Sequence, residues 1–186
     1  MRIISGFLRG KKLKFLKNST TRPLKDSVKE NIFNILKHSN FINVKIENSN
    51  VADIYSGIGS FGLECISRGA KKVDFIERDN LALNILSENL NALSVTKKAK
   101  IFNGEIEKFL NKKFDEKFDI FFFDPPFKDL SFVKSLNLIK KKEIYKTSHV
   151  LVIHREKNSS DNYGNLIKIV NTKNYGRSKI IFANFY

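Results

Sequence analysis

The chain has 186 residues, of which 41% are hydrophobic, and a single cysteine, Cys65. This length and composition indicate a folded domain with its own core and exclude a disordered chain. One cysteine excludes an internal disulfide and a cysteine-rich metal site, and no apolar run approaches the roughly 20 residues that span a bilayer. The N-terminus lacks the apolar core and cleavage site of a signal peptide, so we expect a cytoplasmic protein that does not bind a membrane.

The formal net charge is +15 and the pI is near 9.8. A charge this high indicates a polyanionic partner, most often nucleic acid. Lysines that only keep the protein in solution, or a biased base composition of the genome, would give the same bulk number. The position of the charges and the motifs must therefore decide between these interpretations.

The first 22 residues combine dense positive charge with interleaved apolar residues, and Gly6 and Gly10 bracket a turn. This pattern predicts a β-hairpin with strands at about 2–7 and 11–16. A basic hairpin suits contact with an RNA backbone, although lysines also protect an edge strand from aggregation. The candidate RNA-binding residues are Arg2, Arg9, Lys11, Lys12 and Arg22.

A helix is predicted at about 27–38, where apolar residues recur at helical spacing and Ser27 with Glu30 fits a capping box. Residues 39–49 are polar and rich in asparagine, which indicates a connection. We therefore predict two parts, a basic N-terminal extension at 1–45 that contacts RNA and a larger domain at 46–186.

From about residue 50 the pattern alternates between strand and helix. Asp79 is a candidate N-cap, and Gly69 is expected to end a helix in the left-handed conformation. A tight turn at 174–176 separates the last two strands. The alternation predicts an α/β fold with a mostly parallel, doubly wound sheet and an antiparallel hairpin at one edge. The predicted strands are 51–55, 73–77, 100–103, 118–124, 149–154, 166–172 and 178–184, and the predicted helices are 61–68, 80–93, 105–110 and 130–141.

The stretch from Asp53 to Gly62 contains Gly-x-Gly-x-x-Gly between a strand and a helix. Glycines let the backbone turn sharply and let a ligand approach closely. Alone, the pattern fits a dinucleotide, another nucleotide-like cofactor or a simple tight turn. Glu77, at the end of the next strand, stands where an acid binds ribose hydroxyls, although it could also be a surface acid paired with Arg78 or Lys71.

Asp53 distinguishes the possible cofactors. A carboxylate facing the glycine turn repels a diphosphate and attracts an ammonium or sulfonium group, which favours S-adenosylmethionine. Gly104 and Glu105, after the third strand, are expected to lie beside the adenine, although an acid there would also suit a helix start. The candidate cofactor-binding residues are Asp53, Ser56, Gly57, Gly59, Gly62, Glu77, Arg78, Gly104 and Glu105.

An apolar run, Ile120 to Phe123, ends in Asp124-Pro125-Pro126-Phe127. The run is typical of a strand buried on both faces, and the prolines must end it. In open α/β sheets, ligands bind at the carboxyl ends of the strands. Asp124 and a carbonyl of the Pro-Pro segment could accept the hydrogens of an amino group, and Phe127 could stack on its base. Methyl transfer to nitrogen needs such alignment more than acid–base catalysis. The candidate catalytic residues are Asp124, Pro125, Pro126 and Phe127.

Nearly the full length of the chain resembles the RsmD family, bacterial methyltransferases that act on a guanine N2 of 16S ribosomal RNA. The specific match is the N-terminal block, and the other motifs are shared by many amino-methylating enzymes. The matching segments are 1–6, 10–13, 21–23, 33–36, 53–62, 67–70, 124–127 and 175–176.

The resemblance implies a seven-stranded class I methyltransferase fold, S-adenosylmethionine as cofactor with S-adenosylhomocysteine as product, and rRNA in the 30S subunit as substrate. We expect a monomer that takes part in rRNA processing and ribosome biogenesis, and no metal. The chain departs from the family pattern at Phe127, where tyrosine is usual, at Leu24 and Ser27, where threonine and arginine are expected, and at Glu105-Ile106, where Asp-Ala is expected.

Two alternatives stay open at this point. A DNA adenine-N6 methyltransferase can share the Asp-Pro-Pro-aromatic motif, although the chain has little room for a DNA recognition domain. A non-catalytic basic RNA-binding or assembly factor is the other. His154 and Arg155 are expected at the solvated end of a strand, where they could touch RNA. Cys65 is expected in the core, and Tyr175 is expected to pack against the edge hairpin rather than contact the base.

Overall fold

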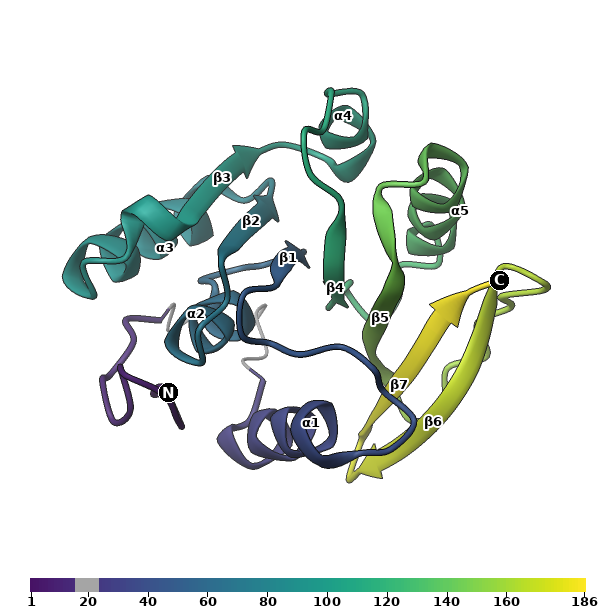
Figure 1. Ribbon diagram of the computed structural model, residues 1–186, viewed down its shortest axis with the longest axis horizontal. Coiled ribbons are helices and arrows are strands. Elements are labelled where there is room, and N and C mark those ends of the chain that lie inside the picture. Colours follow the sequence, from purple (N-terminus) through teal and green to yellow (C-terminus); the bar gives the residue numbers. More distant parts are fainter. Residues whose placement is uncertain (16–23) are drawn as a thin grey trace.

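The computed structural model describes residues 1–15 and 24–186 (Figure 1). Its strands are β1 (Asn50–Ile54), β2 (Lys72–Glu77), β3 (Ala99–Asn103), β4 (Phe118–Phe123), β5 (Tyr145–Glu156), β6 (Ile167–Tyr175) and β7 (Ser178–Phe185). Its helices are α1 (Asp26–His38), α2 (Ser60–Ser67), α3 (Asn80–Ala92), α4 (Ile106–Leu110) and α5 (Phe132–Lys142), with a 3₁₀ turn at Thr96–Lys98.

The strands form one seven-stranded sheet in the order β3-β2-β1-β4-β5-β7-β6. The pairs from β3 to β5 are parallel, whereas β7 is antiparallel to both β5 and β6. The order reverses between β1 and β4, and the crevice at such a reversal is where open α/β sheets bind ligands. The predicted parallel sheet with an antiparallel edge hairpin is confirmed.

Helices cover both faces of the sheet (Figure 1). One face packs against α1, α2 and α3, and the other against α4 and α5. Neighbouring residues of β4 alternate between the two cores, since Ile120 and Phe122 lie in the first and Phe121 and Phe123 in the second. The continuous apolar run of this strand is therefore the consequence of burial on both faces.

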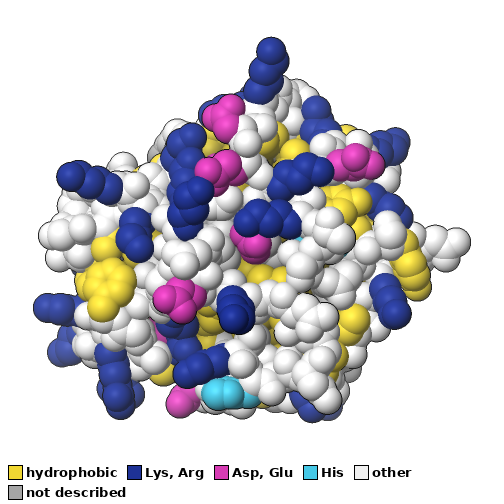
Figure 2. All heavy atoms as spheres, viewed as in Figure 1, with side chains coloured by type: hydrophobic (Ala, Val, Ile, Leu, Met, Phe, Trp, Pro, Cys, Tyr) yellow, Lys and Arg dark blue, Asp and Glu magenta, His cyan; other side chains and the backbone are white. Residues whose placement is uncertain are grey.

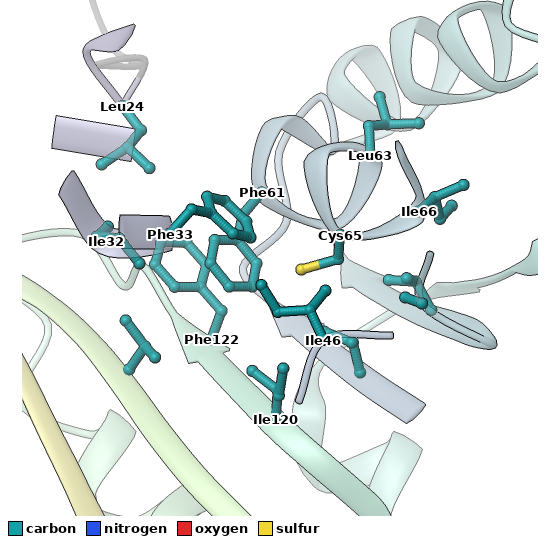
Figure 3. Close-up of a cluster of buried hydrophobic side chains, with 14 of the residues drawn as sticks. Leu24, Ile32, Phe33, Ile46, Phe61, Leu63, Cys65, Ile66, Ile120 and Phe122 are labelled. Atoms are coloured by element: carbon teal, nitrogen blue, oxygen red, sulfur yellow. The ribbon is translucent and has the colours of Figure 1, made fainter. Parts of the chain in front are cut away.

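An aromatic stack joins α1 to the sheet (Figure 3). The rings of Phe33 on α1 and Phe61 on α2 have centroids 5.0 Å apart, and the rings of Phe61 and Phe122 on β4 have centroids 4.1 Å apart. Because Phe61 stands in the first turn of α2 and Phe122 stands two residues before Asp124, the stack lies directly beneath the end of the sheet that carries the motifs.

The N-terminal hairpin is shorter than predicted. Arg2 and Lys12 form an antiparallel bridge, and the Ile3 N–H donates to the Lys11 carbonyl at 2.9 Å. Between these arms the chain turns tightly and docks on the end of α2, where the Phe7 N–H donates to the Ser67 carbonyl at 2.9 Å. The predicted strands at 2–7 and 11–16 are therefore wrong in the described residues, which form only this one bridge, and residue 16 lies outside them.

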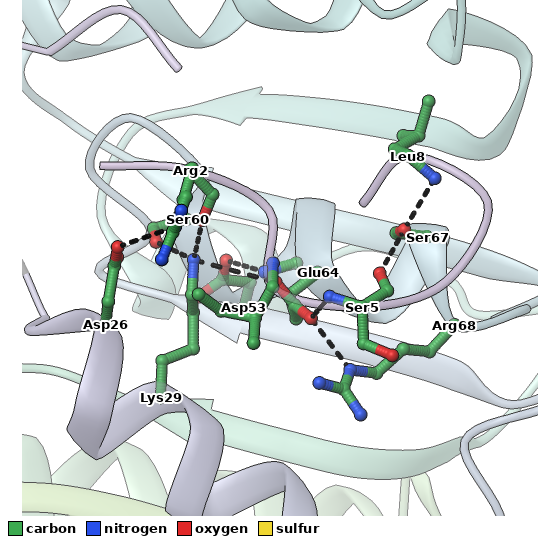
Figure 4. Close-up of polar contacts among 12 residues, drawn as sticks. Arg2, Ser5, Leu8, Asp26, Lys29, Asp53, Ser60, Glu64, Ser67 and Arg68 are labelled. Atoms are coloured by element: carbon green, nitrogen blue, oxygen red, sulfur yellow. Dashed lines mark hydrogen bonds and ion pairs between the residues drawn. The ribbon is translucent and has the colours of Figure 1, made fainter. Parts of the chain in front are cut away.

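A buried ionic cluster fixes this segment to the rest of the molecule (Figure 4). The fully buried Glu64 of α2 accepts from the backbone N–H groups of Ile4 at 2.8 Å and Ser5 at 2.9 Å, and from the Arg68 guanidinium at 2.8 Å. Lys29 of α1, also fully buried, lies 3.6 Å from Glu64. Burial lowers the pKa of Lys29, and the Glu64 carboxylate opposes that shift.

Local signals at helix ends had mixed success. The capping box is wrong, because α1 begins at Asp26 after Lys25 and neither residue of the box caps it with a side chain. Asp79 does cap α3 by accepting from the Leu81 N–H at 2.8 Å. Gly69 ends α2 at a φ of +96°, and Cys65 is buried, as predicted. None of the helices in residues 1–15 and 24–186 has the length and apolarity that crossing a membrane requires.

Substitution of Glu64 tests the ionic cluster. We expect Glu64→Leu to lower the free energy of unfolding by about 3–5 kcal/mol, because it leaves a buried lysine and backbone N–H groups without their acceptor. Glu64→Gln keeps an acceptor oxygen and should cost less. Urea titration followed by circular dichroism measures both.

The matched control is Glu88→Leu, which removes an exposed ion pair from α3 to Lys14 of the same N-terminal segment. That variant should change stability by less than about 1 kcal/mol. Equal losses for Glu64→Leu and Glu88→Leu would contradict the anchoring role of Glu64.

Candidate active site

The pairing of β1 with β4 brings the two motif aspartates together. Asp53 pairs with Phe122, so their side chains point to the same face, and Asp124 follows Phe122 by two positions. Both aspartates line a cleft of about 490 Å³ at the carboxyl ends of the central strands. The glycine turn and Asp124 to Phe127, which are far apart in sequence, therefore share one cavity.

The three glycines of the turn have different reasons to be glycine. Gly57, at a φ of +53°, lines the cleft, and a Cβ there would meet nothing within 4 Å. Gly59, at a φ of +83°, and Gly62 do not line it. A Cβ at Gly59 would come within 2.4 Å of Leu86, and one at Gly62 within 2.3 Å of Phe75. Only Gly57 offers open space to a ligand, whereas the other two let α2 pack closely.

Asp53 is an almost fully buried carboxyl group at the floor of the cleft. Its Oδ2 accepts from the Gly62 N–H at 2.9 Å, and its buried Oδ1 has no partner among the described residues. Burial raises the pKa of Asp53 well above its ordinary value, the Gly62 hydrogen bond opposes this, and the nearby Asp124 and Glu77 carboxylates add to it. A positively charged ligand would satisfy the free oxygen and relieve the repulsion.

Glu77 organises the turn from the neighbouring strand. One oxygen accepts from the Gly57 N–H at 2.8 Å, and the other accepts from the N–H groups of Arg78 at 2.8 Å and Asp79 at 2.9 Å. The alternative of a surface acid paired with the side chain of Arg78 or Lys71 is wrong, because those side chains pair with Glu105 and with Glu116.

A second cavity of about 180 Å³ adjoins the cleft. Gly104 and Glu105 line this second cavity. Tyr55, Glu77 and Arg78 line both cavities, and Ser56 lines the main cleft. Tyr55 has a φ of +62°, which is uncommon for a residue with a bulky side chain. No sequence pattern indicates this strained position, where the chain leaves β1 and turns between the two cavities.

The segment after β4 presents its residues unequally. Pro125 is buried, Pro126 is exposed and Phe127 is half-buried, and all three line the cleft with Asp124. The carbonyls of Pro126 and Phe127 accept from the Arg155 guanidinium, each at 3.1 Å. No donor among residues 1–15 and 24–186 bonds to the Pro125 carbonyl or to Asp124 Oδ2. Within this segment, these two oxygens therefore have no protein donor.

The expectation that His154 and Arg155 lie at a solvated strand end is wrong. The ring of His154 lines the cleft, and its Nδ1 lies 2.7 Å from Asp124 Oδ1. Arg155 is fully buried on the other face of β5, where its guanidinium lies 4.5 Å from the centroid of the Phe132 ring. The strand continues to Glu156, two residues past its predicted end, and this extension buries both side chains.

Arg155 and Asp161 form a buried ion pair behind the motif. The guanidinium contacts both carboxylate oxygens, with Nη2–Oδ1 at 2.8 Å and Nε–Oδ2 at 3.0 Å. Burial by itself raises the pKa of Asp161, but hydrogen bonds from Arg155 and Ser159 hold that pKa below its ordinary value. The pair thus fixes a planar donor against the carbonyls of Pro126 and Phe127.

The N-terminal segment contributes one wall of the cleft through Met1, Phe15 and Leu24. Leu24, a departure from the family pattern, is also a core residue at 6% exposure. Tyr175 packs against the first core, as expected. The candidate RNA-binding residues Arg2, Arg9, Lys11 and Lys12 are exposed outside the lining of the cleft, and Arg22 lies outside the described residues.

Positive charge is not confined to the N-terminal segment. Figure 2 shows lysine and arginine side chains spread over the whole visible face, with a few acidic side chains among them. This distribution suits a polyanion that covers a broad area, but it does not by itself single out the N-terminal segment as the contact.

A family model described as Conserved hypothetical protein 95 matches residues 1–184. The chain belongs to this family. It is 35% identical over 159 residues, 84% of this chain and 79% of the relative, to the Ribosomal RNA small subunit methyltransferase D of Haemophilus influenzae. It is 26% identical to the Uncharacterized methylase RP545 of Rickettsia prowazekii, over 100% of this chain and 98% of that one.

Among solved structures, the chain is similar to one described as "Putative methyltransferase yhhF" from Escherichia coli, with a TM-score of 0.83 and 26% identity over 100% of this chain and 97% of that one. The chain thus has the class I methyltransferase fold, and its relatives are methyltransferases. They imply S-adenosylmethionine as the cofactor.

Substitution of Arg155 tests how the motif is held. We expect Arg155→Met to lower the free energy of unfolding by about 3–5 kcal/mol. The buried Asp161 carboxylate would lose its ion-pair partner, and the carbonyls of Pro126 and Phe127 would lose their hydrogen-bond donor. Arg177→Met is the matched control, since Arg177 is exposed and its nearest carboxylate, Glu156, is 4.0 Å away. A loss for Arg155→Met no larger than that of the control, by chemical denaturation, would show that the pair does not hold the loop.

Proposed function

We propose that this protein transfers a methyl group from S-adenosylmethionine to the exocyclic N2 of a guanine in small-subunit rRNA. The observation that carries the proposal is the single cleft that joins Asp53 and the glycine turn to the Asp124–Phe127 motif. The similarity to small-subunit rRNA methyltransferases supports rRNA as the substrate class.

The charges that line the cleft suit S-adenosylmethionine. S-adenosylmethionine supplies a methyl group on a positively charged sulfur and carries no phosphate. Asp53, with a free buried oxygen, suits a cationic group, and the open space at Gly57 suits close approach of the backbone. Glu77, which lines both cavities, would bind the ribose hydroxyls. The adjoining cavity at Gly104 and Glu105 would bind the adenine.

The other end of the cleft fits an amino group on a planar base. Asp124 Oδ2 and the Pro125 carbonyl are the acceptors that no donor of the described residues occupies, and they would receive the two hydrogens of the amino group. Phe127 would stack on the base, for which an aromatic ring without a hydroxyl suffices. Held in this way, the nitrogen is aligned for transfer, and alignment is the main requirement of the reaction.

The proton balance is simple. When the nitrogen gains the methyl group it becomes positively charged, and it must then lose a proton. The Asp124 carboxylate, which would already accept a hydrogen of the amino group, would receive this proton, and because its side chain is 25% exposed the proton could pass on to water. No metal is needed for any of these steps.

The N-terminal segment would bring the RNA to the cleft. Its residues Met1 and Phe15 line the cleft, and exposed basic residues adjoin them in the chain. We propose that Arg2, Arg9, Lys11, Lys12 and Arg22 contact phosphates, and that residues 1–45 act as the RNA-contacting part. The target base must be unpaired or flipped out to enter the cleft.

Methyl transfer from labelled S-adenosylmethionine tests the proposed function directly. The protein is incubated with naked 16S rRNA, with 30S particles or with DNA, and the nucleic acid is digested to nucleosides. We expect the label in N2-methylguanosine from rRNA or 30S particles. Label in N6-methyladenine of DNA would establish the rival enzyme, and no label in any substrate would favour a non-catalytic RNA-binding protein.

Charge substitutions test the RNA contact. Removal of residues 1–22 is not a clean test, because Ile3, Leu8 and Leu13 are core residues. Joint substitution of the exposed Arg9, Lys11 and Lys12 by Ala should instead leave the fold intact and weaken RNA binding. It should also reduce the salt slope by about 1 for each phosphate that the protein no longer neutralises.

The control for this variant removes three exposed lysines from α5, which are Lys134, Lys141 and Lys142. It changes the net charge by the same amount at a site away from the N-terminal segment. An unchanged salt slope for the N-terminal variant would assign its charges to solvation alone.

A further inference from the structure

His154 stands beside Asp124 because of strand register. Phe123 of β4 pairs with Ile153 of the parallel strand β5, so the next residue on each strand, Asp124 and His154, also point to a common face. His154 is 6% exposed. It is therefore a buried side chain at the floor of the cleft rather than part of the surface around it.

The contact between them has a direct consequence for the tautomer of the ring. His154 Nδ1 lies 2.7 Å from Asp124 Oδ1. We assign the hydrogen of this bond to Nδ1, since a carboxylate oxygen can only accept it. This bond occupies Oδ1 and leaves Oδ2 without a donor among the described residues. The two oxygens of one carboxylate thus have different surroundings, one tied to the protein and one open to the cleft.

The ring makes no other hydrogen bond in the described part of the chain. Its Nε2 is buried without a hydrogen-bond partner. The ring contacts Phe127 edge-on, with 5.6 Å between the ring centroids and 80° between the ring planes. An aliphatic side chain would fill this space without burying an unpaired nitrogen. Packing alone therefore does not explain a histidine here, whereas its bond to Asp124 does.

His149, on the same strand, shows what a purely structural histidine looks like in this protein. Its Nδ1 lies 2.8 Å from the Lys146 carbonyl, and its Nε2 accepts from the Phe185 N–H at 2.9 Å. Both ring nitrogens are bonded to backbone groups, and the ring stacks on Phe185. This histidine secures the other end of β5 against β7 and has no contact with the cleft.

We propose that His154 is a positioning residue for methyl transfer, which holds the Asp124 carboxylate so that Oδ2 faces the acceptor amino group. The inference rests on the proposed function of the cleft. His154 acts through Asp124 and through the edge of Phe127, the two side chains that orient the amino group and its base. Loss of this support lets the carboxylate rotate, so the amino nitrogen is held less well at the moment of transfer.

Two substitutions separate positioning from packing. His154→Asn places an amide N–H close to the position of Nδ1 and can still donate to Asp124, whereas His154→Leu fills the space without a donor. We expect His154→Leu to lower kcat on rRNA by about 10²-fold, with the KM for RNA and the affinity for S-adenosylmethionine nearly those of the wild type. His154→Asn should recover a large part of that kcat. His149→Leu should leave kcat unchanged and lower only the melting temperature.

Nitrogen NMR of the histidine rings gives a readout without turnover. We expect the His154 ring to carry its proton on Nδ1, and Asp124→Ala to shift its signals while leaving those of His149 in place. A proton on Nε2 alone in the wild type, or equal kcat for His154→Leu and the wild type, would overturn the positioning role only. Absence of methyl transfer from the wild type to any RNA, with the His154–Asp124 signal intact, would overturn the proposed function and the positioning role together.

Discussion

The site depends on one constraint, the register in which β1 pairs with β4. The two strands are parallel, and Asp53 lies opposite Phe122. This pairing makes two strands that are far apart in the chain finish at the same edge of the sheet, with their acidic side chains on the same face. A shift of one residue would turn Asp124 toward the α4 and α5 side and away from Asp53. The stack of Phe122 on Phe61, with ring centroids 4.1 Å apart, opposes such a shift because it would be lost.

The same face of the sheet ties the N-terminal segment to the site. The stack of Phe33, Phe61 and Phe122 joins α1, α2 and β4, and Glu64 holds Ile4, Ser5 and Lys29 from the helix that follows the glycine turn. The segment that we propose to bind RNA is therefore fixed to the helix that starts at the cofactor turn. The glycine turn, the Asp124–Phe127 motif and the N-terminal wall of the cleft are thus parts of one packed unit rather than separate modules.

Much of this arrangement could be predicted from the sequence, for reasons that are local. The apolar run that ends in Asp124-Pro125-Pro126 specifies a buried strand and its end, and Gly57 with Asp53 specifies a turn that suits a cationic ligand. Asp79 caps its helix because an acceptor at that position needs only the next turn of backbone. The capping box at Ser27 and Glu30 failed because α1 already begins at Asp26, after Lys25, so that Ser27 lies inside the helix and not at its N-cap.

The residues that sequence reasoning missed all depend on long-range contacts. Nothing near His154 or Arg155 in the chain shows that they reach Asp124 and the carbonyls of Pro126 and Phe127, since the link exists only once β5 lies beside β4. One signal was available: His154 directly follows an apolar run, Val150 to Ile153, just as Asp124 follows Ile120 to Phe123. The roles of Gly59 and Gly62 were also hidden, because their close neighbours, Leu86 and Phe75, come from other elements.

We propose above all that the cleft between Asp53 and Asp124 binds a methyl donor. Calorimetric titration of the purified protein with S-adenosylmethionine tests this most directly. We expect saturable binding at one site per chain, weakened by replacement of Asp53 with asparagine, which removes the negative charge but keeps the side-chain shape. No heat of binding under conditions where the protein is folded would contradict it.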